Sequence, residues 1–274
     1  MSDETLRTAR ATTVVIPLSG AKAETGEREI AVEVGVEVSF GGVPFAVMML
    51  TPADLEDFGV GFSLTEGIVA RAEEVRRVTV TEGERGFGVA VEVAPDRMHT
   101  LLARRRSMSG RTGCGVCGIE DLDALERAQP VGGAGAFAPV RIDAIARALA
   151  ELPERQVLSR ATGATHAAAF ADREGAIQLV REDVGRHNAL DKLVGAILRN
   201  GLEPADGFVV VTSRCSFEMV EKAASLGARL IVAISAPTSF AIERARSLGV
   251  ALVAIARRDT VTVFHGAEAI AYPA

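Results

Sequence analysis

The chain has 274 residues, a length that accommodates one large domain or two modest ones. Its hydrophobic fraction of 48% with only 4% aromatic residues indicates an aliphatic core, and its net charge of -6 argues against general nucleic-acid binding, which favours a basic surface. The N-terminus lacks the apolar segment of a signal peptide, no stretch approaches the roughly 20 apolar residues of a membrane span, and three cysteines suit a reducing compartment. We therefore expect a cytoplasmic protein that binds neither nucleic acid nor membrane.

The first half of the chain carries several segments typical of strands. Residues 28–40 alternate between apolar and polar or small side chains, which is the period of a half-buried strand. Gly41-Gly42 predicts a turn into a second strand over 43–50. Thr51-Pro52-Ala53-Asp54 indicates a helix start, with Thr51 as the cap and Pro52 at the first helical position. Two more strand-like runs follow, near 75–80 and 87–93. This half is predicted to be an antiparallel α+β unit.

The middle of the chain has neither helical nor strand periodicity. Residues 104–118 (RRRSMSGRTGCGVCG) are predicted to form a loop, and the Gly/Ala tract at 132–136 a flexible linker. We place a domain boundary between 110 and 138. The predicted organisation is a tail and first strand (1–27), a small α+β domain (28–112), a CxxC loop with the linker (113–138) and a larger α/β domain (139–274).

The second half alternates between helices and strands. Helical periodicity or a glycine stop predicts helices over 188–198, 217–226 and 240–248. Short apolar runs predict buried strands over 208–211, 230–234 and 250–255. Such alternation is typical of a mostly parallel, layered α/β sheet.

Polar loops follow the predicted strands of this sheet. In α/β sheets, ligands bind beyond the carboxyl ends of the strands. Here those loops are 181–187, 213–216, 235–239 and 256–259, and they contain hydroxyls and arginines next to helix N-termini. Each loop alone is explained by helix capping, but the arginine-bearing loops together indicate a phosphate or nucleotide-like ligand. No dinucleotide or Walker motif is present.

Cys114 and Cys117 are the most informative pair in the sequence. Two thiols three residues apart can share a metal, form a disulfide or pass sulfur as a persulfide. Arginines just upstream, at 104–106 and 111, favour the nucleophilic thiolate. A polar, Gly-rich loop also lets a thiol move between two partners, which a sulfur carrier requires.

Three other interpretations of the pair stay open. A structural zinc site needs four ligands, but the remaining Cys215 and the four histidines lack the usual spacing. A zinc deaminase needs a His-x-Glu motif and a proline before the first cysteine, where Gly113 stands. A thioredoxin-like dithiol needs a strand-to-helix junction, whereas this pair follows a long loop.

Four weaker candidates each have a simpler structural explanation. His187 with Asp183 could be a base and the group that orients it, or a polar helix cap. His166 could line a site or be a core histidine. Glu218 and Lys222 are most simply an i,i+4 pair, and Cys215 a small buried residue.

Five co-linear segments together resemble the formate dehydrogenase accessory sulfurtransferase family (FdhD). The resemblance extends from about residue 28 to 266. Its segments are 110–118 (GRTGCGVCG), 165–169 (THAAA), 182–192 (EDVGRHNALDK), 213–220 (SRCSFEMV) and 235–239 (SAPTS).

The resemblance implies a fold, an activity and a set of partners. It implies a cytidine-deaminase-like C-terminal domain without zinc chemistry and without a bound metal of its own. It implies a homodimeric sulfurtransferase that takes persulfide sulfur from a cysteine desulfurase. The sulfur goes to the bis(molybdopterin guanine dinucleotide) cofactor of molybdenum or tungsten (Mo-bis-MGD), a bound substrate here, and serves formate dehydrogenase.

The resemblance also assigns residues. Cys114 is the expected persulfide carrier and Cys117 assists it. The cofactor-binding stretch aligns with Ile255, Ala256, Arg257, Arg258, Asp259 and Thr260. Relatives can carry Gly-Arg where Asp259-Thr260 stands, so the arginine contact is expected from Arg257 or Arg258. Relatives can also carry Ala at the position of Cys215.

Two alternatives from other functional classes remain. One is a non-catalytic chaperone that binds the cofactor or the immature dehydrogenase. The other is a zinc-stabilised interaction module.

Overall fold

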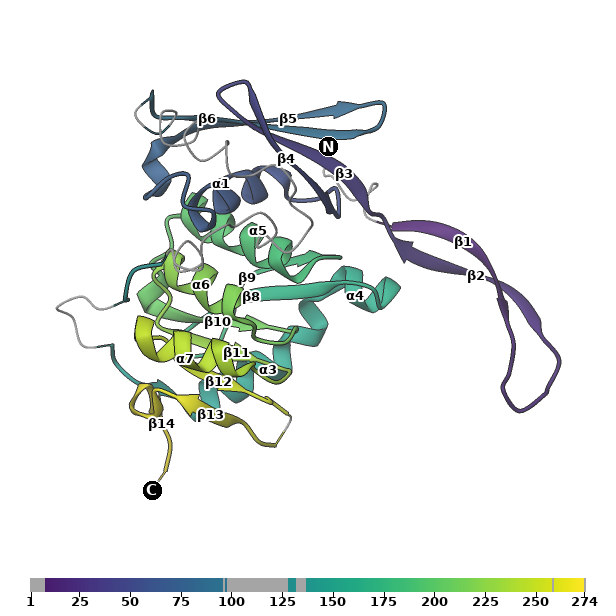
Figure 1. The fold of residues 1–274 in the computed structure, drawn as a ribbon. Coiled ribbons are helices and arrows are strands. Elements are labelled where there is room, and N and C mark those ends of the chain that lie inside the picture. The colour runs from purple at the N-terminus through teal and green to yellow at the C-terminus, as the bar shows by residue number, and fades with distance from the viewer. Residues whose placement is uncertain (1–7, 96, 98–127, 132–136, 258, 274) are drawn as a thin grey trace.

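The structure is a computed structural model that describes residues 8–95, 97, 128–131, 137–257 and 259–273. Its N-terminal half forms a four-stranded sheet of order β4-β3-β6-β5, which lies above the rest of the molecule (Figure 1). Its elements are β3 (Val34–Phe40), β4 (Val43–Leu50), helix α1 (Leu55–Thr65), β5 (Val75–Gly83) and β6 (Gly86–Val93). The predicted all-antiparallel arrangement is wrong, because β6 lies beside β3 and runs parallel to it.

The turn between β3 and β4 follows the prediction. Gly41 and Gly42 both have positive φ, 53° and 79°. This conformation suits glycine and matches the twist of a two-residue hairpin.

A two-stranded arm precedes this sheet and projects from the body (Figure 1). It consists of β1 (Thr8–Val15) and β2 (Glu24–Ala31) in antiparallel pairing. The single strand predicted over 28–40 is therefore two strands in two sheets. Val36, Val38 and Phe40 of β3 are buried, whereas Ile30 of β2 is 46% exposed, because the core of the body ends at the arm.

The second half forms a six-stranded sheet of order β13-β12-β11-β10-β8-β9. Its strands are β8 (His166–Asp172), β9 (Ile177–Asp183), β10 (Gly207–Val211), β11 (Leu230–Ala233), β12 (Ala251–Ala254) and β13 (Thr262–His265). Strands β10, β11 and β12 are parallel, as predicted, and β8 and β13 are antiparallel to their neighbours.

Helices cover both faces of this sheet. The helices of this half of the chain are α3 (Ile142–Arg155), α4 (Val157–Thr162), α5 (Arg186–Arg199), α6 (Phe217–Leu226) and α7 (Ser239–Leu248). Helices α5, α6 and α7 pack on one face, and α3 packs on the other with a small parallel pair, β7 (Val140–Arg141) and β14 (Ile270–Ala271). Gly227 and Gly249 end α6 and α7 in the left-handed conformation, as predicted.

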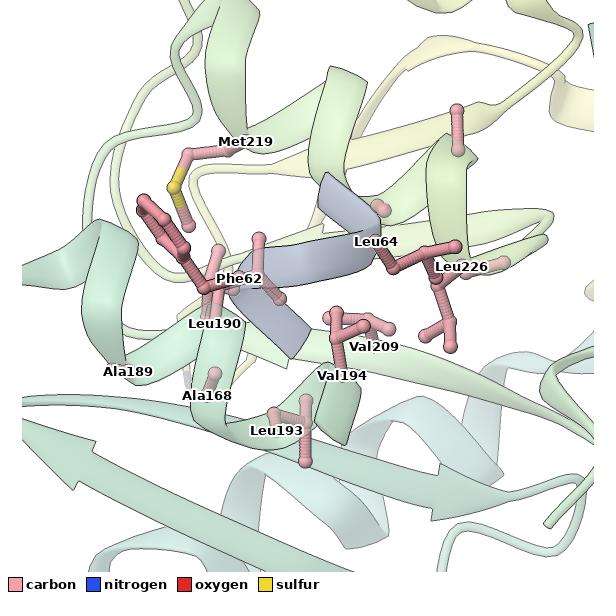
Figure 2. Close-up of a cluster of buried hydrophobic side chains, with 14 of the residues drawn as sticks. Phe62, Leu64, Ala168, Ala189, Leu190, Leu193, Val194, Val209, Met219 and Leu226 are labelled. Carbon is pink, nitrogen blue, oxygen red and sulfur yellow. The ribbon is translucent and has the colours of Figure 1, made fainter. Parts of the chain in front are cut away.

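Helix α1 joins the two halves by packing directly on α5 (Figure 1). A Cβ atom on Gly61 of α1 would lie 1.8 Å from the carbonyl oxygen of Asp191, and one on Gly195 of α5 would lie 1.8 Å from that of Asp57. The two backbones are therefore in contact. Around this crossing, Phe62 and Leu64 of α1 lie among apolar side chains of α5, α6 and the sheet (Figure 2).

The predicted start of α1 is wrong by three residues. The helix begins at Leu55 and its N-cap is Asp54, with a positive φ of 54°. Thr51 does not cap the helix, because its polar groups are used elsewhere: its NH donates to Asp183 and its Oγ1 accepts from the NH of Val184. None of the helices in the described part of the chain is long and apolar enough to cross a membrane.

Candidate functional site at the carboxyl edge of the six-stranded sheet

Four strands end at one edge of the six-stranded sheet. Strands β10, β11 and β12 are parallel, and β9 has the same direction because β8 lies antiparallel between β9 and β10. The N-termini of α5, α6 and α7 follow β9, β10 and β11, so their free NH groups also lie at this edge. The loops singled out in the sequence are thus brought together, an arrangement that suits an anionic ligand.

The loops after β10 and β11 are joined backbone to backbone. The NH of Cys215 donates to the carbonyl of Ala236 at 3.2 Å, and the NH of Thr238 donates to that of Cys215 at 3.0 Å. The Thr238 side chain caps α7 by accepting from Ala241 at 3.3 Å. Ser216, the N-cap of α6, makes no such bond, and its buried Oγ has no hydrogen-bond partner among the described residues. The Ser216 hydroxyl is thus available to donate or accept a hydrogen bond with a ligand.

The stretch after β12 belongs to the same edge. Ile255 has a left-handed backbone, with φ of 51°, which a β-branched residue rarely adopts. Its NH donates to the carbonyl of Ser235 at 3.1 Å, which ties this stretch to the loop after β11. The strained backbone therefore stands at the start of the predicted cofactor-binding residues.

Of the two arginines in this stretch, only Arg257 belongs to the described residues. The guanidinium of Arg257 donates to the carbonyl of Ile234 at 2.6 Å, and the NH of Arg257 donates to the carbonyl of Thr260 at 2.8 Å. Arg257 thus binds the neighbouring loop, while its flanking residue Ala256 is buried and Asp259 is exposed. Arg258 lies outside the described residues.

A cluster of basic side chains stands where β9 leads into α5. Nε of Arg186 is buried and has no hydrogen-bond partner within the described ranges. His187 Nε2 lies 2.8 Å from Glu218 Oε2 of α6, a distance that suits an ion pair, although Nε2 makes no hydrogen bond of regular geometry. His166 opens β8 beside them, and its pKa is lowered by burial and by the positive charges of Arg186 and His187.

Two predicted side-chain pairs are wrong. His187 faces Glu218, while Asp183 binds Lys192 at 2.6 Å. Glu218 and Lys222 do not form an i,i+4 pair, because Lys222 turns to Asp191 of α5 at 2.8 Å. In both cases a partner on another element replaces the partner that is nearer in sequence, since a buried charge needs a partner inside the core.

Cys215 is fully buried, and burial raises the pKa of its thiol to about 12. It is therefore a structural residue, as the sequence indicated. Cys114 and Cys117, together with the arginines at 104–106 and 111, lie outside the described residues. Over the described ranges no cluster of His, Cys, Asp or Glu could hold a metal ion.

The chain resembles known proteins over nearly its whole length. Residues 31–271 match the FdhD/NarQ family. This chain belongs to that family. A relative from Xanthomonas euvesicatoria pv. vesicatoria (strain 85-10), named sulfur carrier protein FdhD, is 49% identical over 247 residues, which cover 90% of this chain and 87% of the relative. A relative of the same name from Bordetella petrii is 46% identical over 246 residues, 90% of this chain and 88% of the relative.

A solved structure has the same fold. A protein described as a candidate formate dehydrogenase accessory protein, from Desulfotalea psychrophila, superposes with a TM-score of 0.77 at 25% identity. The match covers 97% of this chain and 100% of the other. The resemblance to the FdhD family stated from five sequence segments is thus confirmed.

Sequence reasoning missed a buried set of polar residues behind the edge. Thr51, Asp183 and Lys192 are 0% exposed and bind one another. Thr51 and Asp183 are 132 positions apart, so no local spacing could have paired them. The only sequence signal is that Asp183 and Lys192 lie in the longest segment shared with the family, 182–192.

Proposed function

We propose that this protein is a sulfurtransferase that carries sulfur as a cysteine persulfide. It accepts the sulfur from a cysteine desulfurase and delivers it to Mo-bis-MGD or its tungsten form, which it binds as a substrate. The sulfurated cofactor then serves formate dehydrogenase. We place this activity in the cytoplasm and assign it to a homodimer whose larger domain has a cytidine-deaminase-like layering.

One observation carries the proposal: relatives named sulfur carrier protein match about nine tenths of this chain at close to half identity. The family match over 31–271 includes both Cys114 and Cys117. The third cysteine, Cys215, is buried and its thiol stays protonated at neutral pH. The sulfur-carrying role therefore falls to the CxxC pair, and the family resemblance implies Cys114 as the carrier and Cys117 as its assistant.

The loading step is a thiolate exchange. The Cys114 thiolate attacks the outer sulfur of the desulfurase persulfide, a bond forms between Cys114 Sγ and that sulfur, and the sulfur–sulfur bond of the donor breaks. The desulfurase cysteine leaves as a thiolate, so electrons balance without an added oxidant or reductant. The upstream arginines favour the attacking thiolate.

The carboxyl edge of the six-stranded sheet suits the nucleotide ends of the substrate. Three helix N-termini meet there, and buried donors on Arg186 and Ser216 are unused among the described residues. The stretch Ile255–Thr260 borders the same edge. We assign the phosphates and guanine of Mo-bis-MGD to this edge, with Arg186 as a phosphate contact.

The carrier assignment is tested by intact-mass spectrometry after incubation with desulfurase and cysteine. Wild type and Cys215→Ala should gain the mass of one sulfur atom, Cys117→Ala should gain it more slowly, and Cys114→Ala should not gain it. An equal gain by Cys114→Ala rejects Cys114 as the carrier. Cys215→Ala is the matched control for loss of a cysteine that is not reactive.

A non-catalytic chaperone is the competing function, favoured by the same nucleotide-like edge. In a strain that lacks the endogenous protein, the double variant Cys114→Ala, Cys117→Ala should fail to restore formate dehydrogenase activity. Full restoration would identify a chaperone. Stoichiometric zinc in the purified protein would instead support a zinc-stabilised module.

A further inference from the structure

A single buried carboxylate holds the turn that leads from β9 into α5. Asp183 is 0% exposed and accepts four hydrogen bonds. Its Oδ2 accepts from Lys192 Nζ at 2.6 Å and from the NH of Thr51 at 3.0 Å. Its Oδ1 accepts from the NH of Gly185 at 2.8 Å and from Asn188 Nδ2 at 3.1 Å. The Asp183 side chain thus fixes both the backbone turn after β9 and the first turn of helix α5.

Further hydrogen bonds of the same residues attach the turn to the N-terminal sheet. Lys192 Nζ also donates to the carbonyl of Thr51 at 2.9 Å, and the NH of Val184 donates to Thr51 Oγ1 at 3.3 Å. Asn188 Nδ2 donates to the carbonyl of Met49 in β4 at 2.9 Å. The link between β4 and α1 and the turn between β9 and α5 therefore form one hydrogen-bonded unit around the Asp183–Lys192 pair.

The turn has little freedom to relax. A Cβ atom on Gly185 would lie 2.7 Å from Asn188 Nδ2 and 3.4 Å from Asp183 Oδ1, so the backbone is packed against its own anchors. Arg186 and His187 are the next two residues. Their positions at the sheet edge follow from the position of this turn.

We propose that Asp183 is a positioning residue of the sheet-edge site: it sets where Arg186 and His187 stand and links them, through Thr51, to the N-terminal sheet. For the identity of the ligand this inference rests on the function proposed above. The geometry of the turn itself does not depend on that function.

A purely structural role for the pair predicts different results. Burying a charged pair contributes little net stability, and an apolar pair of similar size can replace it at no loss. If Asp183 only stabilises the fold, an apolar pair restores both the stability and the site readouts. If it positions the turn, that replacement restores stability but not the site, because Gly185 and Asn188 lose the carboxylate that orients them.

Three variants separate these roles. In Asp183→Asn the amide oxygen faces the Lys192 ammonium and the Thr51 NH, so the amide NH2 is placed against two donors of the turn, the Gly185 NH and Asn188 Nδ2. Asp183→Leu combined with Lys192→Met replaces the buried pair by apolar side chains of similar size and removes both acceptor oxygens. Asp57→Asn is the matched control: Asp57 is a buried carboxylate of the same interface, but it binds Arg181 and Arg199 instead of the turn.

Two readouts report on the site and one on stability. The chain has four histidines, so the imidazole NMR signals of His166 and His187 can be assigned with His166→Gln and His187→Gln. GDP affinity by calorimetry probes the nucleotide site. Urea denaturation followed by circular dichroism measures stability.

The double variant should be more stable than Asp183→Asn because it leaves no unpaired buried charge, yet show displaced His187 and His166 signals and GDP affinity weaker by about tenfold, the scale of one lost hydrogen bond to a charged group. Asp183→Asn should show the same displacement with lower stability. Asp57→Asn should lose stability and keep both site readouts.

Wild-type histidine signals and GDP affinity in the double variant would overturn the inference, and this test holds even if Asp183→Asn fails to fold. Absence of GDP binding by wild type would instead reject the proposed nucleotide site. The histidine signals would then still decide whether Asp183 positions the turn.

Discussion

Cys215 illustrates how burial decides the chemistry of one residue. Its side chain is fully enclosed at the loop between β10 and α6, and loss of solvent raises the pKa of its thiol to about 12. We expect Cys215 not to react with iodoacetamide in the native protein at neutral pH and to react after denaturation in urea. Peptide mapping of the alkylated protein measures this, with Cys114 and Cys117 as internal references. Fast native labelling of Cys215 would contradict its buried position.

His166 makes the stability of the protein depend on pH. Burial, followed by the positive charges of Arg186 and His187, lowers its pKa below the ordinary 6.5, and Asp183 opposes this in part. The unfolded chain therefore binds the proton more readily than the folded one. The contribution of neutral His166 to stability is complete above pH 6.5 and is lost as the pH falls through the lower folded pKa.

The variant His166→Gln tests this sign. Glutamine does not titrate, so the fall in the urea midpoint between about pH 7.5 and about pH 5.5 should be smaller in the variant than in wild type. An equal fall in wild type and His166→Gln would exclude His166 as the cause.

At the scale of elements, the crossing of α1 and α5 depends on two glycines. A methyl group on Gly61 would overlap the Asp191 carbonyl, and one on Gly195 would overlap that of Asp57. These carbonyl groups belong to the backbone of the opposite helix, so they cannot move aside as the end of a flexible side chain can. We expect Gly61→Ala and Gly195→Ala each to lower the free energy of unfolding by about 2 kcal/mol or more, despite the better helix propensity of alanine.

Gly35→Ala is the control for the glycine prediction. Its Cβ atom would have no neighbour closer than 4.0 Å, so the urea midpoint should change little. Similar midpoints for Gly61→Ala and Gly35→Ala would show that the two helices can separate without cost.

The elements themselves were predictable where the sequence carries a local signal. Helices α6 and α7 combine a helical period with Gly227 and Gly249, and β10–β12 are short runs buried on both faces. The hairpin β8–β9 carries no such signal, since β8 consists largely of alanines. Only a first strand within 1–27 was expected of the arm, and half of the residues of β2 are charged. The parallel pairing of β6 with β3 is a long-range choice that no local pattern contains.

The candidate site was predictable only in outline. The strand-end loops could be placed because chain direction in a parallel sheet fixes which ends meet. The partners of Asp183, His187 and Lys222 could not, because each lies on a different element and is selected by packing. Local spacing instead suggested nearer partners, which the structure rejects.

At the scale of the whole molecule, the two halves share one hydrophobic cluster. It runs from Val38 of β3 through α1 and α5 to Val209 of β10. Figure 2 shows the part of this cluster in which Phe62 of α1 meets α5, α6 and the sheet. Charged contacts of the buried Asp57 with Arg181 and Arg199 cross the same interface. Neither half can expose this surface without a large loss of burial, so the halves are expected to unfold together.

Val38→Ala and Val210→Ala test this cooperativity from opposite ends of the molecule. Val38 lies in the N-terminal sheet, and Val210 lies on the far face of the six-stranded sheet in the second cluster. Each substitution should cost about 1–3 kcal/mol and shift one and the same transition. With no Trp and a single Tyr, calorimetry and far-ultraviolet circular dichroism are the suitable probes. A transition that splits in two for Val38→Ala alone would show that the N-terminal sheet unfolds independently, and the link from Thr51 to Asp183 would then be too weak to couple the two halves.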